Sequence, residues 1–143
     1  NVFSSTAYFD ARYEDAAVRV GNENRSVTEN KVESVPNWIS RSGVNMRYRG
    51  FSLSLLYSYT AETYADALNT VTPPATGAVG LVPAYALLDV NASFRVNNTV
   101  TLRLNVNNVT DKQYFTKRPT FYPGPGIWPS DGRSVNLSVG VRL

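Results

Sequence analysis

The sequence of 143 residues contains no cysteine and no histidine. Their absence excludes thiol nucleophiles, histidine-containing catalytic triads, disulfide bonds and zinc sites with cysteine or histidine ligands. The acidic residues do not replace them: Asp10 and Glu14 share one face of a predicted strand, but four residues of strand separate them by about 13 Å, too far for a glycosidase pair. We therefore predict that the protein is not an enzyme, with no catalytic residue, no metal site and no cofactor.

Long apolar stretches and clusters of charge are also lacking. No stretch reaches about 18 apolar residues, the usual threshold for a transmembrane helix, and the first residues lack the charged start and apolar core of a signal peptide. The net charge is +3, and the lysine and arginine residues are scattered singly along the chain. This distribution gives no nucleic-acid footprint, so we predict no nucleic-acid partner.

What the sequence does contain is alternation of apolar and polar residues. It runs through six segments, near residues 2–14, 37–49, 51–62, 85–96, 100–109 and 134–143. Such a period of two predicts β-strands with one face in an apolar medium. In the first segment we assign Phe3, Ser5 and Ala7 to the apolar face. None of the six apolar faces contains a charged residue, and we predict an all-β, antiparallel fold.

Two architectures fit this alternation, a soluble β-sandwich and a transmembrane β-barrel. Tyrosine and tryptophan lie at or near the ends of the apolar faces, where a membrane interface holds an aromatic belt. The connections also alternate in length, because residues 15–36, 63–84 and 110–133 are long and residues 49–50 and 97–99 are short. Long loops on one rim and short turns on the other are typical of outer-membrane barrels. Both features favour the barrel, with the long loops outside the cell.

Six strands are too few to close such a barrel, because known single-chain barrels have at least about eight. An open sheet would leave backbone groups unpaired in lipid along both edges, which is costly. We therefore predict that residues 1–143 are the C-terminal part of a larger barrel. Assembly of one barrel from several copies is the alternative, and the abrupt start in a strand pattern and the missing signal peptide favour the first interpretation.

Two stretches carry a resemblance to a known family. Residues 85–94 read YALLDVNASF and residues 102–115 read LRLNVNNVTDKQYF. They resemble the Y-x-L-x-D and N-x-x-N-[LV]-x-D-x-x-Y patterns near the end of TonB-dependent outer-membrane receptors. YPGPG at residues 122–126, followed by GRS at 132–134, is similar to the last loop of the siderophore branch. WPSD at residues 128–131 is similar to ferric-citrate-type receptors.

The resemblance implies an energy-coupled importer of a ferric chelate, either a siderophore or iron citrate, in the outer membrane of a Gram-negative bacterium. It implies a barrel of 22 strands, of which these are the last six. It also implies four partners: the rest of the barrel, a plug domain, the lipid bilayer, and the TonB complex, which would be contacted through an N-terminal part absent from this sequence. A passive porin is one alternative, and an importer of cobalamin or oligosaccharide with the same fold is another.

The last long loop combines aromatic side chains with many prolines and glycines. Proline fixes one backbone angle and glycine permits angles that other residues avoid, so together they stiffen a loop that would otherwise be costly to order. A stiff loop can present Tyr122 and Trp128 to a substrate in the extracellular vestibule. The alternative is that these rings only pack against neighbouring loops and the barrel rim.

Basic residues near the outer end are the other candidates for substrate binding, since guanidinium and ammonium groups attract the carboxylates of an anionic chelate. The five candidates are Arg12, Arg41, Lys117, Arg118 and Arg133. The alternative is that they pair with carboxylates such as Asp10, Glu14 and Asp131 or with plug carboxylates. Four further arginines are predicted to lie low in the barrel, facing plug or periplasmic water: Arg47, Arg49, Arg95 and Arg142.

Overall fold

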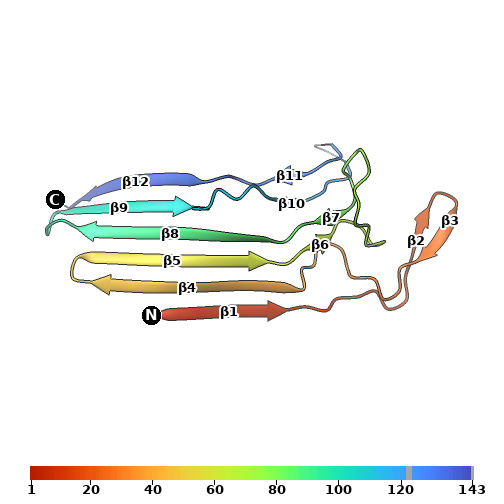
Figure 1. Ribbon diagram of the computed structural model, residues 1–143, viewed down its shortest axis with the longest axis horizontal. Coiled ribbons are helices and arrows are strands. Elements are labelled where there is room, and N and C mark those ends of the chain that lie inside the picture. The colour runs from red at the N-terminus through yellow and green to blue at the C-terminus, as the bar shows by residue number, and fades with distance from the viewer. Residues whose placement is uncertain (122–123, 143) are drawn as a thin grey trace.

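The structure, a computed structural model, describes residues 1–121 and 124–142. Its main body is one antiparallel sheet with the strand order β1-β4-β5-β8-β9-β12 (Figure 1). The strands are β1 (Val2–Tyr8), β4 (Trp38–Tyr48), β5 (Phe51–Thr60), β8 (Tyr85–Arg95), β9 (Val100–Asn107) and β12 (Ser134–Val141). The described residues contain no helix, and so no helix that could cross a membrane. The prediction of an all-β, antiparallel fold is confirmed.

The two ends of the sheet differ, and we call them the turn end and the loop end. At the turn end, tight turns join β4 to β5 and β8 to β9 (Figure 1). Asn97 shapes the second turn, because its side-chain oxygen accepts hydrogen bonds from the backbone N–H groups of Thr99 (2.8 Å) and Val100 (2.7 Å). At the loop end, three long connections extend beyond the sheet (Figure 1).

We call these connections loop 1 (residues 9–37), loop 2 (residues 61–84) and loop 3 (residues 108–133). Each contains one small antiparallel pair of strands. The pairs are β2 (Ala17–Val20) with β3 (Glu23–Ser26), β6 (Thr63–Tyr64) with β7 (Leu81–Val82), and β10 (Phe115–Lys117) with β11 (Trp128–Pro129). Strands of two to four residues are too short to produce a readable alternation, which is why the sequence pattern does not predict them.

One face of the large sheet is apolar. Residues paired across an antiparallel sheet point to the same face, and the central row on this face is Val44, Leu55, Val90, Val106 and Val135. Only two hydrophobic side chains among the described residues are buried, and both lie in loops. The apolar face therefore has no second layer packed on it, unlike the face of a soluble β-sandwich.

Aromatic residues border this apolar face at both ends. At the turn end, Tyr48, Phe51 and Phe94 form one row across three strands. At the loop end, the rings of Tyr8 and Trp38 pack with their centroids 4.9 Å apart. Ten residues of strand separate Trp38 from Tyr48, which is about 34 Å along the strand, or about 26 Å across a bilayer for a strand tilted by about 40°. This height matches the apolar band of an outer-membrane barrel, about 25 Å.

The first strand differs from its prediction in length and in facing. It ends at Tyr8, not near residue 14. Val2 pairs with Val44 on the apolar face, whereas Phe3 pairs with Gly43 on the polar face. A Cβ atom on Gly43 would lie only 2.4 Å from the Phe3 ring, so the missing side chain makes room for that ring. The neighbouring strand sets the facing of β1, because a shift of one residue moves every side chain to the other face.

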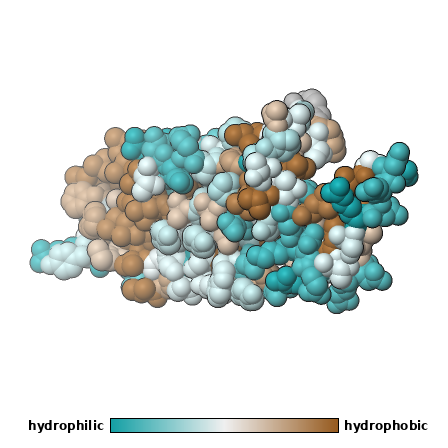
Figure 2. All heavy atoms as spheres, turned by 45° about the vertical axis from the view of Figure 1, so that its right-hand side comes forward, coloured by the Kyte–Doolittle hydropathy of each residue, from teal (hydrophilic) through white to brown (hydrophobic). Residues whose placement is uncertain are grey.

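Hydrophobic and hydrophilic residues are also distributed differently over the large sheet and loop 1. In Figure 2, hydrophobic residues gather over the large sheet, and hydrophilic residues cover the protruding β2–β3 hairpin of loop 1. Val27, which follows this hairpin directly, is almost completely buried, with 1% of its surface exposed. Loop 1 therefore buries an apolar side chain beyond the sheet.

Candidate functional site

Hydrogen bonds tie loop 1 to loop 2. The Asn69 side chain accepts a hydrogen bond from the Lys31 backbone N–H and donates one to the Lys31 carbonyl, both at 2.8 Å. The Asn30 side-chain amide donates to the carbonyl of Ala67 at 2.8 Å. The amide of Asn69 therefore pairs with the backbone as a neighbouring strand would, and it fixes the two loops side by side.

Arg118 ties loop 2 to loop 3. Its Nε donates to the carbonyl of Leu81 (3.0 Å) and its Nη1 to the carbonyl of Gly77 (3.1 Å). The guanidinium also lies over the Phe115 ring, 4.8 Å from the ring centroid. Arg118 is one of the residues predicted to attract an anion, and in the structure its guanidinium holds two loops together.

A small groove opens where the three loops meet. It has a volume of about 120 Å³ and is lined by Ser34, Ala65, Val82, Lys117, Arg118, Pro119 and Trp128. Lys117 and Trp128 pair across β10 and β11, and about half of the Trp128 surface is exposed. A water molecule occupies about 30 Å³ of liquid volume, so the groove has room for one carboxylate or one small ring. It can hold one edge of a larger ligand.

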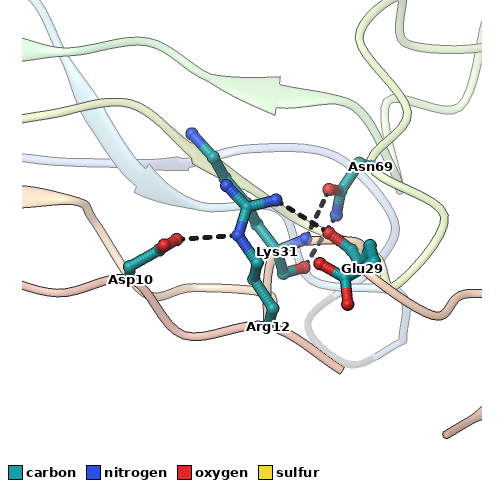
Figure 3. A network of polar contacts seen from close by, with 5 residues as sticks. All are labelled: Asp10, Arg12, Glu29, Lys31 and Asn69. Carbon is teal, nitrogen blue, oxygen red and sulfur yellow. Dashed lines mark hydrogen bonds and ion pairs between the residues drawn. The ribbon is translucent and has the colours of Figure 1, made fainter. Parts of the chain in front are cut away.

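Arg12 is already paired within loop 1. Its Nε lies 2.9 Å from Asp10 Oδ1, and its Nη1 donates to the carbonyl of Glu29 at 2.9 Å (Figure 3). Arg12 also forms a β-bridge with Lys31. The Lys31 carbonyl in turn accepts a hydrogen bond from the Asn69 side chain. Pairing with Asp10 is the alternative that the sequence left open for this arginine, and the structure places Arg12 in the network that supports loop 1.

The other predicted residues lie apart from the groove lining. Arg41 is exposed on the polar face of β4, between its paired neighbours Ser5 and Ser58. Arg133 precedes β12, and its side-chain Nη1 reaches the carbonyl of Val109 at 3.4 Å. Tyr122 lies outside the described residues. Of the seven predicted residues, the groove brings together three: Lys117, Arg118 and Trp128.

The two stretches behind the family resemblance meet at the base of loop 3. Asp89 Oδ1, from the first stretch, accepts a hydrogen bond from the backbone N–H of Asn108 in the second, at 2.8 Å. The rings of Tyr85 and Tyr114, one from each stretch, pack at a tilt with their centroids 4.6 Å apart. Asp111 Oδ1 accepts from the backbone N–H of Arg133 at 2.9 Å. These motif residues therefore build the joint between β8, β9 and the start of β12.

Asn108 stabilises the same joint from inside. It is buried, with 4% of its surface exposed, and its backbone has a positive φ of 49°. Its side chain donates to the Lys112 carbonyl (3.0 Å) and accepts from the Lys112 N–H (2.9 Å). Asparagine tolerates this left-handed conformation better than most residues, so the motif requires asparagine for a structural reason.

Among the described loop residues, one titratable group, Tyr13, has a perturbed pKa. The hydroxyl of Tyr13 donates a hydrogen bond to the Glu33 carboxylate within loop 1. This hydrogen bond, together with burial and the negative charge of Glu33, raises the pKa of Tyr13 above its usual value. Nothing in the sequence pattern indicates this contact, because the two residues are twenty positions apart.

Among the described residues, no group of three histidine, cysteine or acidic side chains can hold a metal ion.

Comparison with known families identifies the class. The model of the family described as "TonB dependent receptor-like, beta-barrel" matches residues 1–109. The chain belongs to this family, in agreement with the resemblance of its motifs. It is a family of transport receptors and not of enzymes.

Two known proteins, PiuA and FecA, are similar to this chain. The probable TonB-dependent siderophore receptor PiuA of Acinetobacter baumannii is 36% identical over 84 residues, which are 59% of this chain and 10% of PiuA. The crystal structure of the siderophore receptor PiuA from Acinetobacter baumannii matches with a TM-score of 0.78 at 23% identity, over 99% of this chain and 19% of that one. The unliganded ferric citrate transporter FecA matches with a TM-score of 0.68 at 21% identity, over 80% of this chain and 18% of that one. The chain thus spans a fifth or less of each of these proteins.

Proposed function

We propose that this chain is part of the barrel of an outer-membrane receptor that imports a ferric chelate into the periplasm, with energy supplied through TonB. The observation that carries the proposal is the 36% identity to a probable siderophore receptor. The apolar face bordered by aromatic rows supports the membrane location, because its height suits the hydrocarbon layer. A passive porin and an importer of cobalamin or oligosaccharide have no observation in their favour.

The joined loops would form one wall of the site that captures the chelate. The ammonium of Lys117 and the indole of Trp128 border the same groove, so an anionic chelate with a ring or carboxylate at its edge could use both. Because Asn69 and Arg118 already hold the three loops together, binding would not have to order them. Preorganisation of this kind strengthens binding by reducing its entropic cost.

The remaining partners follow from family membership. We propose that the rest of the barrel closes the sheet along its β1 and β12 edges, that a plug domain occupies the lumen, and that the TonB complex is contacted by a part of the receptor outside this chain. A barrel of 22 strands stays part of this proposal. Among ferric chelates, both a siderophore and iron citrate could place one edge in the groove, and the likeness to FecA concerns the fold alone.

Uptake of labelled iron tests the proposal directly. A strain lacking the complete receptor gene, and the same strain with the gene restored, would be given radiolabelled iron as citrate, as a catecholate chelate and as a hydroxamate chelate. We expect restoration of uptake for one chelate and abolition of that uptake when TonB is removed. Unimpaired uptake of all three in the deletion strain would contradict iron import, and unimpaired uptake of iron citrate alone would eliminate citrate.

Variants of the groove test where the chelate binds. In the complete receptor, Lys117→Gln should raise the half-saturating chelate concentration about two- to fivefold, the loss expected for one exposed charge contact. Trp128→Ala should raise it further, since aromatic anchors contribute more than exposed charges. Lys112→Gln is the matched control, because Lys112 is exposed in the same loop but does not line the groove. Equal effects of Lys117→Gln and Lys112→Gln would argue against the groove.

A further inference from the structure

Arg118 belongs to two features at once, the groove and the junction between loops 2 and 3. Its side chain is half-buried and lines the groove together with Lys117. Its Nε and Nη1 donate hydrogen bonds to the carbonyls of Leu81 and Gly77 in loop 2. A guanidinium has five N–H donors, and the others have no acceptor among the described residues. Arg118 can therefore bond to loop 2 and to a ligand in the groove at the same time.

The charge around the groove indicates which ligand group suits it. Lys117 and Arg118 are the charged residues of the described lining, and no acidic residue lies beside them. A planar carboxylate can accept two parallel hydrogen bonds from a guanidinium, and the ammonium of Lys117 adds a second positive charge. The volume of about 120 Å³ leaves room for one such group. The groove is therefore suited to a single carboxylate at the edge of a larger ligand.

Loop 2 depends on Arg118 for its attachment to loop 3. Among the described residues, the hydrogen bonds that join these two loops are the two donated by Arg118. Bonds such as that from the Leu81 N–H to the Val71 carbonyl, at 3.1 Å, lie within loop 2. The two loops also approach closely at a pair of glycines, because a Cβ atom on Gly77 would lie 3.4 Å from the Gly126 Cα. Movement of the guanidinium would therefore release this part of loop 2 from loop 3.

We propose that Arg118 is a positioning residue that couples the binding of a carboxylate in the groove to the order of loop 2. A carboxylate bonded to the remaining N–H groups holds the guanidinium in place, so its bonds to the two carbonyls of loop 2 open less often. By linkage the effect is reciprocal, and a more ordered loop 2 binds the carboxylate more tightly.

The inference rests on the proposed function for its natural ligand, which would be a chelate with an exposed carboxylate. The coupling itself can be measured with a simple carboxylate and without iron uptake. The two proposals can therefore fail separately.

Amide hydrogen exchange of the complete receptor, with and without iron-free citrate, tests the coupling. Citrate is the probe because it is small and carries several carboxylates, and sodium chloride at the same ionic strength is the control for screening. We expect citrate to slow exchange in residues 77–82 about fivefold, and sodium chloride to leave it unchanged. Exchange that citrate does not slow would overturn the proposal, whether or not the receptor imports iron. Slowed exchange in a receptor that imports no iron would contradict the proposed function and support the coupling.

Two substitutions separate coupling through Arg118 from a general loosening of the loops. Arg118→Lys keeps a positive charge at the groove, but an ammonium lacks the planar fork that can bond to two carbonyls and a carboxylate together. In this variant citrate should no longer slow exchange in residues 77–82. Asn69→Ala is the matched control, because it removes the bonds to Lys31 in loop 1 and leaves Arg118 in place. Loop 2 should then exchange faster, and citrate should still slow it about fivefold. An equal effect of citrate in the two variants would overturn the proposal.

Discussion

The loop end and the turn end of the sheet differ in the signs of their charged residues and in how these residues are paired. Outside the turn end, nine basic and eleven acidic residues occur together, and several of these charged groups are engaged within the chain, as Arg12, Arg118 and Tyr13 with Glu33 show. The turn end holds the other five basic residues, all arginine, and no acidic residue. Charges of both signs are therefore paired within the loops, whereas the turn end carries positive charge alone.

The separation of the two ends depends first on the apolar band between them. Val90→Arg would place a charge in the central row of the apolar face, at a cost of about 2–4 kcal/mol if that face contacts the bilayer midplane. The next residue, Asn91, points to the polar face, so Asn91→Arg should cost far less. Folding of the complete receptor into phospholipid vesicles across a urea series measures both. Equal costs would show that the two faces do not differ in environment.

Two asparagines allow the ends to be compared directly. Each makes two side-chain hydrogen bonds to backbone groups, Asn108 at the loop end and Asn97 at the turn end. Asn108 is buried and Asn97 is exposed, so the backbone groups freed by Asn108→Ala cannot all turn to water. We expect a loss of about 2–3 kcal/mol for Asn108→Ala and about 1 kcal/mol or less for Asn97→Ala, from the same urea series. The reverse order would refute the view that the loop end is the more tightly built.

A substitution of Arg118 disrupts the contact between loops 2 and 3 without changing the large sheet. Arg118→Gln removes the guanidinium that bonds Gly77 and Leu81, so amide hydrogen exchange in residues 77–82 should become about tenfold faster. Arg95→Gln is the matched change at the turn end. It should leave exchange in loop 2 unchanged, because Arg95 lies at the other end of β8. Unchanged exchange in Arg118→Gln would mean that loop 2 is ordered without loop 3.

The smallest expected effect concerns Tyr13. Its hydrogen bond to Glu33 raises the pKa of Tyr13 above the usual value of about 10. A raised pKa means that the bond stabilises loop 1 fully at neutral pH and is lost only as the pH rises through that higher value. Ultraviolet titration of tyrosinate should show one late-titrating group that is missing in Tyr13→Phe. Tyr8→Phe is the control, since the Tyr8 ring packs against Trp38 and the partner of Glu33 is Tyr13. A late group that persists in Tyr13→Phe would contradict the assignment.

Prediction from sequence succeeded where the physical signal is periodic. Alternation is repeated over many residues in β4, β5, β8, β9 and β12, and each of these strands faces as predicted. It failed for β1, where Phe3 and Val2 are both apolar and the pattern alone permits either facing. Gly43 on the neighbouring strand leaves room for the Phe3 ring on the polar face. Its position opposite Phe3 cannot be read from the sequence of β1 itself.

The candidate site was less accessible to prediction for a related reason. Lys117, Arg118 and Trp128 are close in sequence and were predicted together, and the groove does contain all three. The contacts that position Arg118 come from Gly77 and Leu81 in another loop. Asn30 and Asn69 were not predicted at all, because a side-chain amide that imitates a strand has no characteristic sequence pattern.

By itself, the sequence determined the strands, their two unlike faces and the division into long loops and short turns, because these depend on neighbours along the chain. Its arginines looked scattered for the same reason, since Arg47, Arg95 and Arg103 are far apart in the sequence. Only the tertiary structure placed Arg47, Arg95 and Arg103 together, because pairing across strands brings residues that are far apart in sequence to within a few strand spacings of one another. Contacts between and within the loops likewise decided that Arg12 and Arg118 are engaged by the chain itself, because their acceptors lie on residues that the fold brings beside them.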